Sequence, residues 1–258
     1  MKPGRFVKKF EVHYYEVDKF LKLTLPSLLN YLEDAAISHS AAAGLDVSEL
    51  KSSGHGWILN RWFINFNEYP VLSQKLTVET WPSDFERCYG WREFFVKDTE
   101  NRTIITASSL WIYLDIAKRR PARIPSDFGE RYGLEPIKAI NAQFSDLDFE
   151  LTPEATLEFS VRRSDIDSNE HVNNTKYVEW LLEAIPEHIT QNSLIKSFEI
   201  NYKKETNYGA AVLSECSKEC GTAGTCSYVH KITDKSTGQI HACARTTWEK
   251  LSDCLEEK

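Results

Sequence analysis

Two stretches of the chain carry apolar residues at helical spacing. Residues 25–43 have one apolar face, Thr24 as a good N-cap and Pro26 in the first turn. That face consists of Leu28, Leu29, Leu32 and Ala36. Residues 175–185 repeat the pattern, and either Asn173 or Asn174 suits their N-cap. Their apolar positions are Tyr177, Val178, Leu181, Leu182 and Ile185. The pattern predicts one long helix in each half of the chain.

The rest of the pattern predicts strands, because segments rich in β-branched and aromatic residues alternate with turn-like breaks. In the first half these segments are residues 10–17, 57–66, 75–81, 88–97 and 103–114. In the second half they are residues 157–163, 194–204, 211–218, 225–233 and 239–249. Each half therefore has the order strand, helix, four strands. Between the halves, residues 117–153 hold four of the nine prolines.

This repeated order predicts an internal duplication with an α+β fold, in which each half wraps a long antiparallel sheet around its own helix. We expect a first domain over residues 1–130, a linker over 131–153 and a second domain over 154–258. The length of 258 residues is enough for two domains that each bury a core.

Composition excludes several classes of protein. Hydrophobic residues make up 41% of the chain, and no apolar run approaches the roughly 20 residues that cross a bilayer. The net charge of −7 argues against a nucleic-acid partner. The basic N-terminus lacks the apolar centre of a secretory signal, so we expect a cytoplasmic protein whose six cysteines are reduced. The spacing of Cys216, Cys220 and Cys226 is not that of a structural zinc site, and we expect no metal.

The densest polar chemistry lies directly before the second helix. If residues 167–171 are extended, the side chains of Asp167, Asn169 and His171 project to one face. A carboxylate, an amide and an imidazole then meet at a helix N-terminus. Unpaired N–H groups and the positive end of the helix dipole suit an oxygen that gains negative charge during a reaction.

The first half lacks this set. In the predicted repeat, Lys19, Leu21 and Leu23 stand where the second half has Asn169, His171 and Asn173, so acid–base chemistry is expected in the second half alone. The first half is instead rich in aromatic residues, which fit either an ordinary core or the lining of a pocket for an apolar ligand. They are Trp57, Trp62, Phe63, Phe66, Trp91, Phe94, Phe95 and Trp111.

Three segments carry a resemblance to a known family. The first is residues 162–183, Arg-Arg-Ser-Asp-Ile-Asp-Ser-Asn-Glu-His-Val-Asn-Asn-Thr-Lys-Tyr-Val-Glu-Trp-Leu-Leu-Glu, and the second is residues 198–206, Phe-Glu-Ile-Asn-Tyr-Lys-Lys-Glu-Thr. In the first half, residues 67–70, residues 78–81 and Trp111 follow in the expected order. Over most of its length, the chain resembles the acyl-ACP thioesterases of plants and bacteria.

The resemblance implies a tandem (double) hotdog fold and hydrolysis of the thioester between a fatty acyl chain and the phosphopantetheine arm of acyl carrier protein (ACP), without a cofactor. It implies an acyl-chain pocket in the first domain and catalytic residues in the second. The implied catalytic residues are Asp167, Asn169, His171 and Glu205. Thr206 stands where many plant members carry a cysteine, so an acyl-enzyme on that cysteine does not apply here.

Direct attack by water is therefore expected. Either Glu205 or His171 would accept the proton, Asn169 would orient the water or the carbonyl, and Asp167 would hold its neighbours in place. Three alternatives stay open: an acyl-CoA thioesterase, a double-hotdog hydratase or dehydratase, and a lipid carrier without catalysis. The chain is expected to be a monomer or a homodimer.

Overall fold

The computed structural model describes residues 5–141, 143–167, 169–219 and 224–251. The chain forms two compact units, Met1–Gln143 and Phe144–Lys258, which we call the N-terminal unit and the C-terminal unit. The division between them falls inside the segment 131–153.

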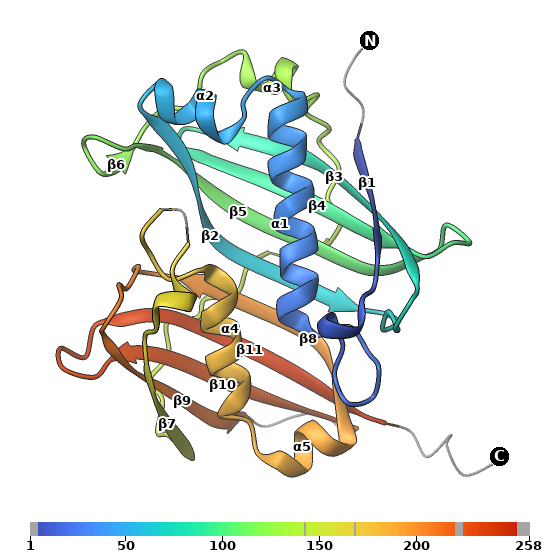
Figure 1. The fold of residues 1–258 in the computed structure, drawn as a ribbon, viewed down its shortest axis with the longest axis vertical. Coiled ribbons are helices and arrows are strands. Elements are labelled where there is room, and N and C mark those ends of the chain that lie inside the picture. Colours follow the sequence, from blue (N-terminus) through green and yellow to red (C-terminus); the bar gives the residue numbers. More distant parts are fainter. Residues whose placement is uncertain (1–4, 142, 168, 220–223, 252–258) are drawn as a thin grey trace. The chain divides into compact units, whose positions relative to one another are not determined.

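The N-terminal unit has an antiparallel sheet in the order β1-β3-β4-β5-β2, and the two-residue strand β6 pairs with β5 (Figure 1). Its strands are β1 (Phe6–Glu11), β2 (His55–Phe66), β3 (Lys75–Glu86), β4 (Tyr89–Lys97), β5 (Thr103–Asp115) and β6 (Arg120–Pro121). The helices are α1 (Leu25–Ala42), α2 (Val47–Ser52) and α3 (Phe128–Arg131), with a single 3₁₀ turn, η1 (Tyr14–Glu16), before α1.

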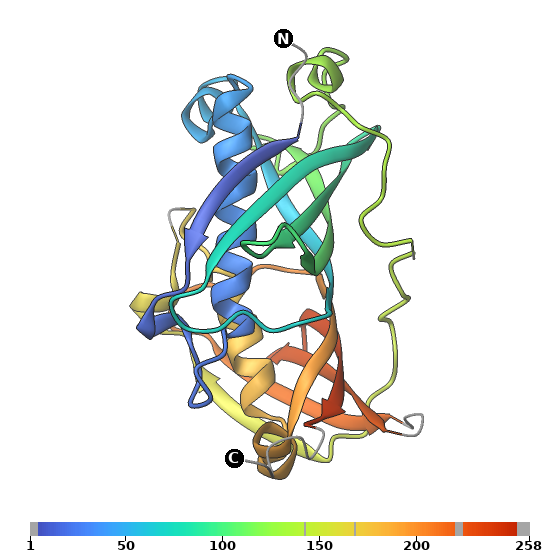
Figure 2. The same ribbon diagram turned by 90° about the vertical axis from the view of Figure 1, so that its right-hand side faces the viewer.

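Helix α1 lies across one face of this sheet (Figure 2). Thr24 caps it by accepting the N–H of Ser27, and the predicted apolar face of the helix is buried. The exposed fractions of Leu28, Leu29 and Leu32 are all 0%. Burial of that face holds the helix in place, since a helix gains most of its stability from tertiary packing.

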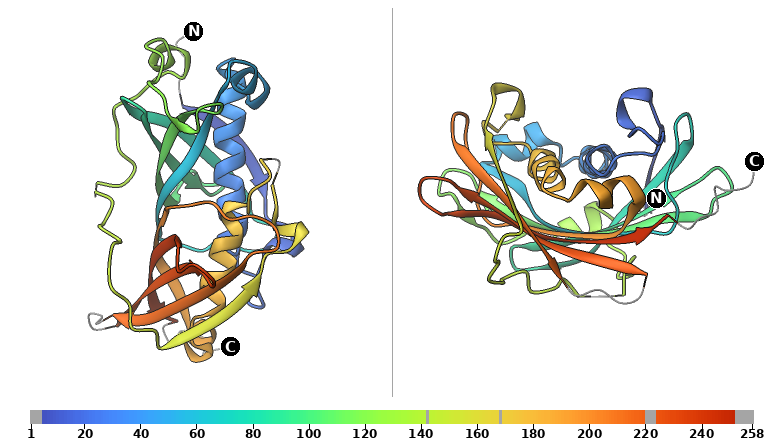
Figure 3. Two further views of the ribbon diagram at one scale, coloured as in Figure 1. Left: turned by 90° about the vertical axis from the view of Figure 1, so that its left-hand side faces the viewer. Right: turned by 90° about the horizontal axis from the view of Figure 1, so that it is seen from below.

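The C-terminal unit repeats this arrangement with the sheet order β8-β11-β10-β9-β7, again antiparallel throughout. Its strands are β7 (Ala155–Ser160), β8 (Ser193–Tyr202), β9 (Ala211–Glu219), β10 (Thr225–Asp234) and β11 (Ile240–Lys250). Its helices are α4 (Asn174–Glu183) and α5 (Glu187–Asn192), with a 3₁₀ turn, η2 (Arg163–Asp165), before α4. Helix α4 lies in the concave side of the curved sheet (Figure 3).

The two sheets match strand for strand: β1 corresponds to β7, β2 to β8, β3 to β9, β4 to β10 and β5 to β11. In both units the first strand leads through a 3₁₀ turn into the long helix. The predicted duplication and the α+β class are thus seen in the topology.

Some predicted boundaries were wrong. Strand β1 ends at Glu11 instead of residue 17, because the chain turns at η1. Strand β3 continues past Pro82 to Glu86, since a bulge between Pro82 and Asp84 accommodates the missing N–H of the proline. The short helices α2, α3 and α5 were not predicted.

Two structural observations bear on composition. The cysteines within the described ranges, Cys88, Cys216, Cys226 and Cys243, are free thiols, and Cys220 and Cys254 lie outside those ranges. None of the helices in the described part of the chain combines the length and apolarity that a bilayer crossing needs.

Candidate active site

The segment before α4 is a tight turn, not the extended stretch that would place Asp167, Asn169 and His171 on one face. The N–H of Asp167 donates to the carbonyl of His171, and the N–H of Glu170 donates to the carbonyl of Asp167. One carboxylate oxygen of Asp167 also accepts the N–H groups of Asn169 and His171, at 2.7 and 3.4 Å. Glu170 has a φ of +65°, in the left-handed region. The Asp167 side chain therefore organises the turn on which His171 stands. Ser168 lies outside the described residues.

The same turn occurs in the N-terminal unit around Asp18, whose carboxylate accepts the N–H groups of Phe20 and Lys22 at 2.8 and 3.0 Å. Each turn is closed by one bridge, Val17 with Leu23 or Ile166 with Val172. These bridges align the two halves at a spacing of 149 residues, one fewer than the spacing that the sequence suggested. The structural counterparts of Asn169, His171 and Asn173 are Phe20, Lys22 and Thr24, rather than Lys19, Leu21 and Leu23.

The N-terminus of α4 is capped by Asn173, one of the two predicted candidates. Its side-chain oxygen accepts the N–H of Thr175 at 2.9 Å, and its carbonyl accepts the N–H of Lys176. The N–H of Asn173 itself donates to the carbonyl of Asp165. Within the described residues, this leaves the N–H of Asn174 as the one amide of the first helical turn without an acceptor.

Glu205 lies in the loop that follows β8, 34 residues after His171, and the structure brings the two side chains together. The distance between Nδ1 of His171 and Oε2 of Glu205 is 3.2 Å. Their side chains are 32% and 38% exposed, so solvent reaches both. The two loops are joined because the N–H of Val172 donates to the carbonyl of Thr206 at 3.1 Å. The fold thus brings a histidine and a remote carboxylate together in the C-terminal unit.

Asn169 and Thr206 lie near His171 and Glu205 on the same two loops. The side chain of Asn169 is exposed, and its backbone N–H donates to the Asp167 carboxylate. The side chain of Thr206 is buried.

Two residues in contact with the Glu205 loop were not predicted to belong to the site. Tyr177 on α4 accepts the N–H of Thr206 at 3.1 Å, and burial raises the pKa of its phenol above the usual value. His241 lies on β11. Its Nδ1 is 2.9 Å from the carbonyl oxygen of Lys204. The sequence pattern places Tyr177 on the apolar face of its helix, and His241 falls in a strand with no motif around it.

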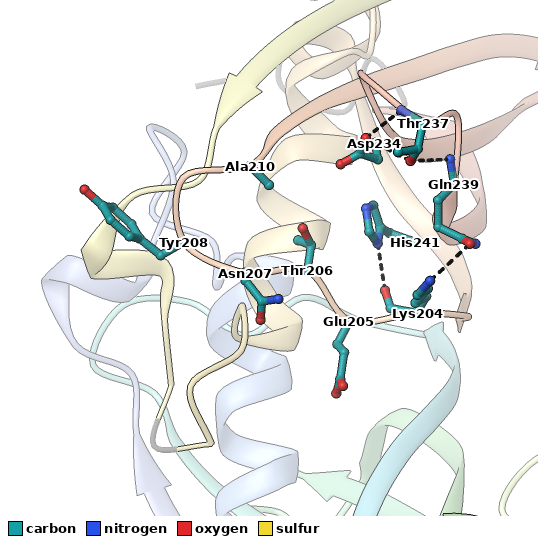
Figure 4. A pocket seen from close by; sticks show the side chains of 10 residues that line it. All are labelled: Lys204, Glu205, Thr206, Asn207, Tyr208, Ala210, Asp234, Thr237, Gln239 and His241. Carbon is teal, nitrogen blue, oxygen red and sulfur yellow. Dashed lines mark hydrogen bonds between the residues drawn. The ribbon is translucent and has the colours of Figure 1, made fainter. Parts of the chain in front are cut away.

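A cavity of about 250 Å³ lies beside this loop (Figure 4). It is lined by Lys204, Glu205, Thr206, Asn207, Tyr208, Ala210, Asp234, Thr237, Gln239 and His241. In the part of the chain that the structure describes, no cluster of three or more His, Cys, Asp or Glu side chains could hold a metal ion.

Comparison with known proteins identifies the family. The profile of the acyl-ACP thioesterase N-terminal domain matches residues 3–132, and the profile of the C-terminal domain matches residues 150–250. The chain belongs to the acyl-ACP thioesterase family. A palmitoyl-acyl carrier protein thioesterase from the chloroplast of Arabidopsis thaliana is 27% identical over 213 residues, which are 78% of this chain and 52% of the plant protein. The chain therefore spans about half the length of that relative.

Solved structures confirm the double hotdog fold of this acyl-ACP thioesterase family member. A provisionally assigned oleoyl thioesterase from Lactobacillus plantarum superimposes with a TM-score of 0.89 at 24% identity, over 96% of this chain and 97% of that chain. An acyl-ACP thioesterase from Bacteroides thetaiotaomicron gives a TM-score of 0.82 at 25% identity, over 94% and 97% of the two chains.

Proposed function

We propose that this chain hydrolyses the thioester between a fatty acyl chain and the phosphopantetheine arm of ACP. The observation that carries the proposal is the contact of 3.2 Å between His171 and Glu205 beside the N-terminus of α4. Family membership supports the substrate class, and the pairing of an imidazole with a carboxylate supports acid–base chemistry on water.

The proposal gives the two nitrogens of His171 different tasks. Nδ1, which lies 3.2 Å from the carboxylate, carries the proton, and Nε2 keeps its lone pair. In this proposal, Nε2 takes a proton from water while Glu205 stabilises the imidazolium that forms. The water oxygen bonds to the thioester carbon, and the negative oxygen of the tetrahedral intermediate accepts the N–H of Asn174.

Collapse of the intermediate breaks the carbon–sulfur bond. His171 returns its proton to the leaving sulfur, and the products are a free fatty acid and the thiol of the carrier arm. The leaving thiol has a pKa of about 8.5, well below that of an alcohol, so this step makes modest demands on the site. Asp167 positions His171 by holding its turn, and Asn169 orients the water or the carbonyl.

The proposal places the acyl chain in the N-terminal unit and the chemistry in the C-terminal unit. Trp62, Phe66 and Phe94 of the N-terminal unit are buried and belong to its core. The remaining predicted aromatic residues are half-buried and supply the apolar surface that an acyl chain requires. They are Trp57, Phe63, Trp91, Phe95 and Trp111.

The test compares hydrolysis of one acyl chain on two carriers, ACP and coenzyme A, with analysis of the products. We expect free fatty acid and a clear preference for the ACP thioester. A strong preference for coenzyme A would contradict the choice of carrier. Release of water from a β-hydroxyacyl thioester that stays intact would instead indicate a dehydratase, and tight binding of fatty acid without turnover would indicate a lipid carrier.

A further inference from the structure

Both peptide groups that flank Glu205 are held by side chains from other elements. On the N-terminal side, Nδ1 of His241 lies 2.9 Å from the carbonyl oxygen of Lys204, and Figure 4 shows the ring pointing to that oxygen. On the C-terminal side, the N–H of Thr206 donates to Oη of Tyr177 at 3.1 Å. The backbone of Glu205 is thus fixed before and after its α-carbon.

The two side chains are suited to this task. Tyr177 and His241 are only 3% and 4% exposed, and their ring centroids lie 6.5 Å apart. A carbonyl can only accept a hydrogen bond, so Nδ1 of His241 is its protonated nitrogen. The other ring nitrogen, Nε2, is buried without a partner among the described residues. The histidine is therefore buried with one unsatisfied nitrogen, as is His230 of the same sheet through its Nδ1.

The N-terminal unit provides an internal control, because its backbone repeats this arrangement. The carbonyl of Ile104 accepts the N–H groups of Asn67 and Glu68, as the carbonyl of His241 accepts those of Lys203 and Lys204. The N–H of Leu23 donates to the carbonyl of Pro70, as that of Val172 donates to Thr206. The backbone contacts are therefore part of the shared fold.

The side chains at these positions differ between the units. Leu28 takes the place of Tyr177, Ile104 that of His241 and Tyr69 that of Glu205. Pro70, in the place of Thr206, has no N–H to donate. Tyr177 and His241, which we call the holders, thus occur in the unit that contains Glu205. Apolar residues replace them in the other unit.

We infer that Tyr177 and His241 are positioning residues that fix the Glu205 carboxylate against His171 by holding the peptide groups on either side of it. The inference rests on the proposed function, in which Glu205 supports His171 during hydrolysis. A small displacement of a catalytic group lowers the rate strongly, so loss of either holder should reduce kcat.

The first experiment removes one oxygen atom from the site. Tyr177→Phe keeps the ring and loses the acceptor for the Thr206 N–H. We expect kcat on acyl-ACP to fall about tenfold with KM within about twofold of the wild type, because the change affects the reacting geometry rather than substrate binding. Tyr228→Phe is the matched control, since it removes the same atom from another buried tyrosine of the C-terminal unit. It should leave kcat unchanged.

The second experiment separates the two nitrogens of His241. In His241→Asn the side-chain amide can still donate from nearly the position of Nδ1, whereas His241→Leu has no donor. We expect His241→Asn to retain most of kcat and His241→Leu to lose about tenfold or more. His230→Leu, at another fully buried histidine of the same sheet, controls for loss of a buried imidazole. Melting temperatures of all variants report on folding.

Unchanged kcat in folded Tyr177→Phe and His241→Leu, or equal losses in His241→Asn and His241→Leu, would overturn the inference. The proposed function fails separately, because it requires Glu205→Gln to lose activity whatever the holders do. Losses in the holder variants that match those of the Tyr228 and His230 controls would indicate a general effect on stability and would also contradict the inference.

Discussion

Nδ1 of His171 lies 3.2 Å from Oε2 of Glu205, although the two residues come from separate loops of the C-terminal unit. The turn organised by Asp167 carries the histidine, and the loop after β8 carries the carboxylate. The N–H of Val172 links the two loops through the carbonyl of Thr206. In the N-terminal unit the corresponding residues are Lys22 and Tyr69, with the Lys22 ammonium 5.7 Å from the centre of the Tyr69 ring. The duplicated fold is thus shared, while the contact between an imidazole and a carboxylate belongs to the C-terminal copy.

The first prediction concerns the two matching aspartates. Asp167→Ala and Asp18→Ala each remove a carboxylate that accepts two backbone N–H groups, so each should lower the free energy of unfolding by about 1 kcal/mol. Asp167→Ala should also lower kcat about tenfold, because it loosens the turn that carries His171. Urea unfolding and steady-state kinetics measure the two effects.

Asp18→Ala is the control for this comparison, since it loosens the same turn in the unit without the pair. Asp167→Asn should be milder than Asp167→Ala, because its side-chain oxygen still accepts the N–H groups. Equal kcat values for Asp167→Ala and Asp18→Ala would show that the turn does not position His171.

The second prediction concerns Thr206, whose hydroxyl the proposed mechanism does not use. Thr206→Ala should keep kcat within about threefold of the wild type, because a threonine without an adjacent strong base is a poor nucleophile. Mass spectrometry during turnover should detect no acyl adduct on the protein. Thr206→Ser is the matched control, since it keeps the hydroxyl. An inactive Thr206→Ala beside an active Thr206→Ser, with an acyl adduct in the wild type, would favour covalent catalysis.

The third prediction concerns the pH dependence of stability. Burial, with Arg92 beside it, lowers the pKa of His39 to about 3, and Nη1 of Arg92 donates to its Nδ1 at 2.9 Å. The unfolded chain binds a proton at this histidine below about pH 6.5, while the folded chain does not. The contribution of neutral His39 to the free energy of unfolding is therefore fully present above about pH 6.5 and decreases as the pH falls towards 3. At pH 5 the loss should be about 2 kcal/mol.

Urea unfolding at pH 7 and pH 5 measures this effect. His39→Asn should reduce the difference between the two pH values, because the asparagine oxygen can accept from Arg92 without titrating. His188→Asn, at an exposed histidine on α5, should leave the difference as it is in the wild type. If His39→Asn and the wild type lose equal stability between the two pH values, His39 does not cause the dependence.

Much of the fold could be predicted from the sequence, because hydrophobic periodicity reports which faces are buried. The predicted helix 25–43 differs from α1 by one residue, and the apolar face of α1 is buried as expected. The pattern does not report where the chain turns through polar contacts. The segment 167–171 alternates like a strand, yet the Asp167 carboxylate folds it into a turn by accepting N–H groups from two residues of the same segment.

The candidate site was less accessible to sequence reasoning. Spacing alone cannot relate Glu205 to His171 across 34 residues, and only the resemblance to a family linked them. Tyr177 and His241 had no signal of their own, because a tyrosine on a buried helix face and a histidine in a strand are both common in cores. Their contacts with Thr206 and Lys204 depend on how α4 and β11 lie beside the loop after β8.

The kcat of purified Glu205→Gln on an acyl-ACP substrate, measured beside the wild type and His171→Ala, tests the central claim most directly. Glutamine keeps the size of the side chain but cannot stabilise an imidazolium, so kcat should fall by about 10²–10⁴-fold in Glu205→Gln and at least as far in His171→Ala. The melting temperatures of both variants should stay close to that of the wild type. Full activity in both folded variants would contradict the proposal that the His171–Glu205 pair performs the hydrolysis.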